Sequence, residues 1–115
     1  MPLSDLFDQS PSDETPIACD LSVLDDPEAH DRRSNALFDD RLEMRRVKGG
    51  YALRYPAAMD YAERILDFIR HERRCCPFLT FEIAFEPEGR GIWLYFGGDE
   101  RVEEYLTSQF EAHAS

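Results

Sequence analysis

Residues 42–55, Leu-Glu-Met-Arg-Arg-Val-Lys-Gly-Gly-Tyr-Ala-Leu-Arg-Tyr, are the stretch from which the fold of this chain is best predicted. Side chains alternate in character from Leu42 to Val47 and again from Tyr51 to Tyr55, as they do in strands with one buried face. The link Lys48-Gly49-Gly50 supplies the positive φ angles that a tight turn needs. The stretch therefore predicts a β-hairpin.

A helix is predicted directly after the hairpin. Pro56 ends the second strand, and Pro77 ends the helix because it lacks an amide proton and disfavours the α conformation at residue 76. Between the two prolines, apolar residues recur at helical spacing. They are Ala58, Ala62, Ile65, Leu66, Phe68, Ile69 and Cys76.

A second hairpin and helix follow. Residues 80–86 and 92–96 alternate on either side of the turn sequence 87–91, and Asp99 can cap a last helix with Val102, Tyr105, Leu106, Gln109 and Phe110 on one face. A shift of 41 residues places Leu53 on Leu94, Tyr55 on Phe96, Tyr61 on Val102 and Ile65 on Leu106. The two units thus look like a degenerate repeat, although two strand-to-helix junctions can also match by chance.

Upstream, Asp26-Pro27-Glu28 is typical of a helix start and predicts a helix over 27–40. Residues 1–17 contain three prolines and no basic residue, so we expect a flexible acidic tail before a single domain at 18–115. The predicted order is α, β, β, α, β, β, α. This order predicts an α+β two-layer sandwich, with a four-stranded, mainly antiparallel sheet and helices on one face.

The net charge of the chain disfavours some classes of binding partner. Its formal net charge is −11, from 24 acidic and 13 basic residues, and such a field repels nucleic acids and anionic membranes. Lys48 is the one lysine, and the other basic residues are arginines, which fits either a halophilic source or an acidic protein from a GC-rich genome. No apolar run reaches the ~20 residues of a membrane span, and no signal peptide is recognisable. We expect a cytoplasmic protein with free thiols.

The adjacent thiols Cys75 and Cys76 are the concentrated chemistry of the sequence. On a helix, His71 lies on the side of Cys75 and Glu72 on the side of Cys76, so each thiol has a second donor nearby. Both sulfurs can hold one ion if the last turn unwinds before Pro77. Cys19, on the approach to the first helix, is the remaining cysteine and could fold over the pair.

Three thiolates suit mercury, trivalent arsenic or monovalent copper, whereas zinc usually requires a fourth ligand such as His71. Arg73 and Arg74 would favour the thiolate forms, but the negative end of the helix dipole opposes them, and the sequence leaves the sign open. The alternative interpretation is that Cys76 is simply a core residue in register with Ile65 and Ile69. The other two histidines, His30 and His113, are predicted to be surface residues.

The sequence resembles a group of small prokaryotic proteins with an E-R-x-C-C-P-F motif, matched here by Glu72-Arg73-Arg74-Cys75-Cys76-Pro77-Phe78. Residues 50–55, Leu79-Thr80-Phe81-Glu82, Trp93-Leu94 with Gly97, and Cys19-Asp20-Leu21 extend the likeness over about residues 18–107. Genes of this group are often found beside heavy-metal response genes of the mercury type. The resemblance therefore implies a role in metal response.

Three hypotheses follow. The first is a protein without enzymatic activity that binds a soft metal or metalloid through Cys19, Cys75 and Cys76, with His71 or Glu72 as auxiliary donors. The second is a thiol redox protein or enzyme in which one thiol of the pair attacks and the other resolves, with Arg73, Arg74 or His71 lowering a thiol pKa. The third is a structural or interaction module with buried cysteines, such as a homodimer formed through a sheet edge or the open sheet face.

Overall fold

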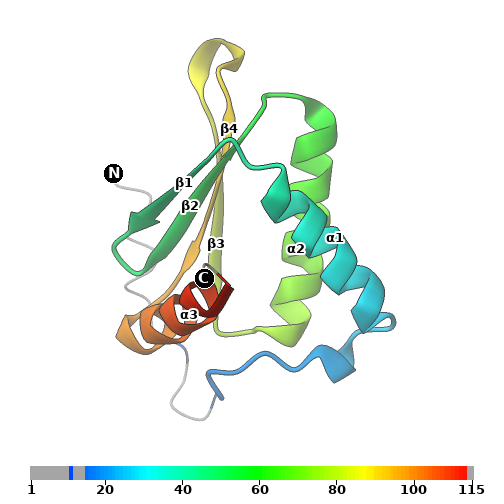
Figure 1. The fold of residues 1–115 in the computed structure, drawn as a ribbon, viewed down its shortest axis with the longest axis vertical. Coiled ribbons are helices and arrows are strands. Elements are labelled where there is room, and N and C mark those ends of the chain that lie inside the picture. Colours follow the sequence, from blue (N-terminus) through cyan, green and yellow to red (C-terminus); the bar gives the residue numbers. More distant parts are fainter. Residues whose placement is uncertain (1–10, 12–14, 114–115) are drawn as a thin grey trace.

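The computed structural model describes residue 11 and residues 15–113, with side chains up to residue 110, and its elements follow the predicted order (Figure 1). The predicted tail, residues 1–17, falls mostly outside this range and stays a prediction. Short 3₁₀ turns occur at Leu21–Val23 and Pro87–Gly89. The longer elements are α1 (Pro27–Asp39), β1 (Glu43–Val47), β2 (Gly50–Tyr55), α2 (Met59–Cys75), β3 (Thr80–Phe85), β4 (Ile92–Gly97) and α3 (Glu100–His113).

The four strands form one sheet in the order β1-β2-β4-β3, and every neighbouring pair is antiparallel. The predicted α+β class and sheet are thus confirmed. The two central strands, β2 and β4, are the equivalent strands of the two hairpin and helix units. Their register sets Leu53 opposite Leu94 and Tyr51 opposite Phe96.

Local sequence accounts for where the elements begin and turn. The Asp26 carboxylate accepts a hydrogen bond from the Ala29 amide at 3.0 Å, which caps α1. Between β1 and β2, Gly49 has φ of 90°, a conformation that favours glycine. Gly50 is required for a different reason, because a Cβ atom there would lie 2.0 Å from the carbonyl oxygen of Phe96.

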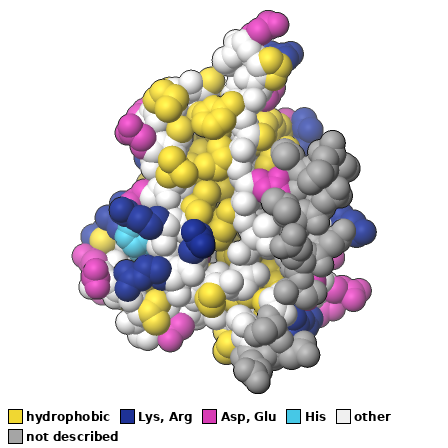
Figure 2. All heavy atoms as spheres, turned by 180° about the vertical axis from the view of Figure 1, so that it is seen from behind, with side chains coloured by type: hydrophobic (Ala, Val, Ile, Leu, Met, Phe, Trp, Pro, Cys, Tyr) yellow, Lys and Arg dark blue, Asp and Glu magenta, His cyan; other side chains and the backbone are white. Residues whose placement is uncertain are grey.

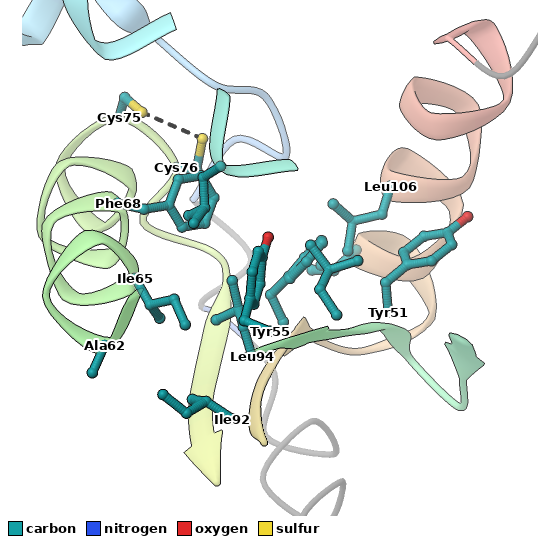
Figure 3. Close-up of a cluster of buried hydrophobic side chains, with 14 of the residues drawn as sticks. Tyr51, Tyr55, Ala62, Ile65, Phe68, Cys75, Cys76, Ile92, Leu94 and Leu106 are labelled. Carbon is teal, nitrogen blue, oxygen red and sulfur yellow. Dashed lines mark hydrogen bonds between the residues drawn. The ribbon is translucent and has the colours of Figure 1, made fainter. Parts of the chain in front are cut away.

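The core lies between the sheet and the helices, which pack on one face of it. Phe38 of α1 shows this arrangement, because its ring centroid lies 5.3 Å from that of Phe68 in α2, 6.5 Å from Phe96 in β4 and 6.1 Å from Phe110 in α3. Figure 3 shows Cys75 and Cys76 at one end of this core, beyond Phe68. None of the helices in the described part of the chain is long and apolar enough to cross a bilayer.

Candidate functional site

The site begins where α2 ends. Cys75 is the last helical residue, and Cys76 leaves the helix with φ of −129° and ψ of 66° before Pro77. The Cys76 amide still donates to the Glu72 carbonyl at 2.6 Å, so the chain departs without losing its last helical hydrogen bond. This unwinding brings the sulfurs of Cys75 and Cys76 to 3.5 Å from each other, as predicted for a shared site (Figure 3).

Cys19 closes the site from the other side and forms a disulfide with Cys76. Its segment crosses the C-terminal end of α2 (Figure 1), where the Asp20 amide donates to the Cys75 carbonyl at 2.8 Å and Arg74 Nη2 donates to the Val23 carbonyl at 2.7 Å. The prediction that Cys19 folds over the pair is confirmed. The expectation of free thiols is wrong for Cys19 and Cys76, which are bonded to each other, and the two hydrogen bonds hold the Cys19 segment against the end of α2.

Glu72 is the carboxylate at the centre of the site. Its Oε2 lies 2.9 Å from Cys76 Sγ and accepts a hydrogen bond from the Cys75 thiol at 3.5 Å. Its Oε1 lies 3.4 Å from Nε2 of His30. Burial raises the pKa of Glu72, and the neighbouring His30 opposes this shift.

Cys75 is the free thiol of the described residues, and it is 1% exposed. Burial, followed by the charge of Glu72, raises its pKa to about 12. The sequence left open whether the thiol pKa is raised or lowered, and for Cys75 it is raised. A thiol with a raised pKa is a poor nucleophile at neutral pH. Arg74 is engaged with Val23 and Arg73 is exposed, so thiol activation by either arginine stays a prediction.

The sequence predicted His71 as an auxiliary donor and His30 as a surface residue, but His30 is the histidine that lies among the donor atoms. His30, predicted to lie on the surface, is 3% exposed because α1 packs against α2, and its ring stacks on His71 with 5.1 Å between centroids. His71 has its Nδ1 2.8 Å from the Asp67 carbonyl oxygen, and it belongs to neither group of converging donor atoms around Glu72. His113 lies outside the residues whose side chains are described.

Two groups of donor atoms converge within the described residues. One consists of Cys19, Glu72 and Cys76, and the other of His30, Glu72 and Cys75, with the donor atoms of each group all within 4.8 Å of one another. Glu72 belongs to both. Four of the five predicted ligands therefore meet in one place, and His30 takes the position expected for His71.

The spacing of residues in α1 was the one signal that could have identified His30. His30, Ser34 and Leu37 are spaced at i, i+4 and i+7, and all three are buried. The same side of α1 borders a cavity of about 500 Å³ between α1 and α2, which His30 lines together with Phe68. The site thus lies at the junction of α1, α2 and the segment that carries Cys19.

The fold and the site together define an antiparallel α+β sandwich with a cluster of three sulfurs, a carboxylate and an imidazole at the end of one helix. Comparisons of the chain with protein-family models, with curated proteins and with solved structures found no match. A fold of this kind can carry many functions, so the function must be argued from the site itself.

Proposed function

We propose that the reduced protein binds one soft metal or metalloid ion through Cys19, Cys75 and Cys76. The observation that carries this proposal is that two sulfurs lie next to Cys76 Sγ. Cys19 Sγ is bonded to Cys76 Sγ, and Cys75 Sγ lies 3.5 Å from Cys76 Sγ. Reduction of the disulfide would leave the Cys19 and Cys75 thiols on either side of the Cys76 thiol, with Glu72 beside both pairs. Such a set of soft donors suits mercury, trivalent arsenic or monovalent copper.

The surroundings of the sulfurs also suit such an ion. Cys75 and Cys76 are buried in the core, which keeps water away from two of the three donors. Glu72 and His30 add an oxygen and a nitrogen for an ion such as zinc that takes a fourth ligand. With arsenite the reaction balances as As(OH)₃ and three thiols giving a tris-thiolate and three waters. The resemblance to proteins with the E-R-x-C-C-P-F motif supports the same function.

Titration of the reduced protein with mercuric ion or arsenite under nitrogen tests this proposal. We expect one ion per chain, a thiolate-to-metal absorption band, and the disappearance of three titratable thiols. Cys19→Ser should weaken arsenite binding at least tenfold, because it leaves two thiols. Met59→Ser is the matched control, since it removes an exposed sulfur outside the site. A reduced protein that gives no band and keeps its thiol count with both ions would contradict the proposal.

A second candidate function, thiol redox chemistry, is favoured by the Cys19–Cys76 disulfide. An external dithiol would attack the sulfur of Cys19, the less buried of the two bonded cysteines, become oxidised to a disulfide, and release the thiols of Cys19 and Cys76. Cys75 is poorly suited to attack because burial raises its pKa. Peroxide added to the reduced protein in equimolar amount should re-form Cys19–Cys76 and yield two waters, with Cys75 left free in peptide mass spectra. Oxidation to a Cys75–Cys76 pair would argue against this assignment.

A further inference from the structure

Strand β3 is an edge of the sheet and carries the sequence Thr-Phe-Glu-Ile-Ala-Phe at residues 80–85. Natural proteins usually protect such edges with charges, prolines or bulges, because an open strand can pair with another chain. The opposite edge, β1, has this protection in Glu43, Arg45 and Arg46. Strand β3 has neither proline nor basic residue, and its single charged residue is Glu82.

Among the described strands, only β4 pairs with β3, and the backbone groups on the other side of β3 can be assigned. Glu86, one residue beyond β3, donates its amide at 2.9 Å to the carbonyl of Gly91, which directly precedes β4. Hydrogen-bonded and non-hydrogen-bonded pairs alternate along an antiparallel ladder, so the even-numbered residues of β3 bond to β4. The amides and carbonyls of Phe81, Ile83 and Phe85 therefore point away from β4.

An apolar surface lies beside this edge. Phe85 of β3 is 60% exposed and Leu66 of α2 is 56% exposed, while Ile69 and Ile83 are half-buried. The α1 helix covers the other side of α2, where Asp60, Arg64 and Asp67 line the cavity between the helices. Leu66 and Ile69 are on the opposite side of the helix, where Leu66 is exposed and Ile69 is half-buried against the core. Figure 2 shows hydrophobic side chains gathered in a continuous stripe on the rear face.

We propose that β3 pairs with β3 of a second copy of this chain about a two-fold axis, which joins the two sheets into one antiparallel sheet. A register centred on Ile83 uses the outward-pointing backbone groups and sets Phe81 opposite the partner's Phe85. It also sets Glu82 opposite the partner's Ala84. A register centred on Glu82 would bring two like charges face to face, which is unfavourable.

The helices of both copies then lie on the same side of the joined sheet, and Leu66 and Ile69 extend the contact beyond the strands. A strand of this length spans about 20 Å, so the interface belongs to the smaller specific ones, of about 1,200 Å² in total. Each copy carries a net charge of −11, which opposes association until salt screens it. The dimer is therefore reversible and favoured at high ionic strength.

Sedimentation velocity over a range of protein concentrations, in 0.15 M and 1 M NaCl, tests the dimer. We expect a monomer–dimer equilibrium that shifts toward dimer at 1 M NaCl. Phe85→Lys and Leu66→Lys should each raise the dissociation constant at least tenfold, and both should fold because these side chains are more than half exposed. Leu42→Lys, at an equally exposed position before β1, is the matched control and should dimerise like the unmodified chain.

Hydrogen exchange identifies the contact. The amides of Phe81, Ile83 and Phe85 should become protected as the protein concentration rises, whereas amides of β1 should not. A monomer at every concentration, a larger assembly, or a dimer that forms equally well in Phe85→Lys and leaves these three amides unprotected would overturn the proposal.

Discussion

Glu72 shows how far single residues could be placed from the sequence. Its spacing of four from Cys76 predicted the contact that the structure shows, because both residues belong to one helix. Its contact with His30 was not predicted, since it depends on how α1 packs against α2, 42 residues away in the chain. The spacing within one helix therefore predicts the contact of Glu72 with Cys76, whereas its contact with His30 depends on tertiary packing.

Cys75 leads to a prediction about alkaline stability. Its folded pKa of about 12 lies above the ordinary thiol value of 9.0, so its contribution to stability is complete below pH 9 and is lost as pH rises toward 12. Between pH 8 and pH 10.5 the oxidised protein should lose about 2 kcal/mol more unfolding free energy than the Cys75→Ala variant. Urea unfolding followed by the fluorescence of Trp93 measures this difference.

The Cys75→Ala variant is also the control for other titrating groups. Burial raises the pKa of Tyr55 as well, but Tyr55 is present in both proteins and its effect cancels in the comparison. Mass spectra should confirm that the Cys19–Cys76 link persists at each pH. Equal losses of stability in the two proteins would show that Cys75 ionises as easily in the folded state as in the unfolded one.

At the scale of elements, the sequence was informative where the signals are local. The ends of α1 and of the strands lie within a residue of their predicted positions, because proline, glycine and capping aspartate act on their near neighbours. The link between the segment at Cys19 and the end of α2 joins residues 57 apart. No periodicity carries that information, so proximity could be proposed but a covalent bond could not.

The disulfide joins these two elements and should stabilise the fold. A closed loop of this length lowers the entropy of the unfolded chain by an amount worth about 4 kcal/mol at 25 °C. Reduction with dithiothreitol at pH 7.5 should therefore lower the unfolding free energy by up to that amount, as measured by urea denaturation.

Two variants separate the disulfide from the free thiol. Cys19→Ser lacks the bond, so dithiothreitol should leave its stability unchanged. Cys75→Ala keeps the bond and should lose as much stability on reduction as the unmodified chain. If reduction has the same effect on Cys19→Ser as on the unmodified chain, the loss of stability does not come from the Cys19–Cys76 link.

At the scale of the whole molecule, the pattern of strands and helices was enough to predict a sandwich with helices on one face. The pattern alone could not predict which two strands form the edges of the sheet. That depends on which strand of each hairpin lies in the centre. Only the observed order shows that the charged strand β1 and the apolar strand β3 are the two edges. The difference in charge between the two edge strands can therefore be recognised only once the strand order is known.

The net charge gives the last prediction, which concerns salt. The 24 acidic residues exceed the 13 basic residues by 11, and the repulsion within this excess of negative charge opposes the compact state. Surface ion pairs such as Arg64–Asp40 and Arg33–Asp67 act in the other direction, since salt weakens them, but each contributes under about 1 kcal/mol. Raising NaCl from 0.05 M to 0.5 M should therefore increase the unfolding free energy by about 1–2 kcal/mol.

Urea is the appropriate denaturant for this measurement because it is uncharged, and dilute protein keeps the chain monomeric. Relief of repulsion should level off above about 0.5 M, where the Debye length is already only a few ångströms. A gain that continues in proportion to concentration would indicate stronger burial of apolar surface instead. A loss of stability with added salt would mean that the ion pairs, and not the excess of acidic groups, dominate the electrostatics of the folded protein.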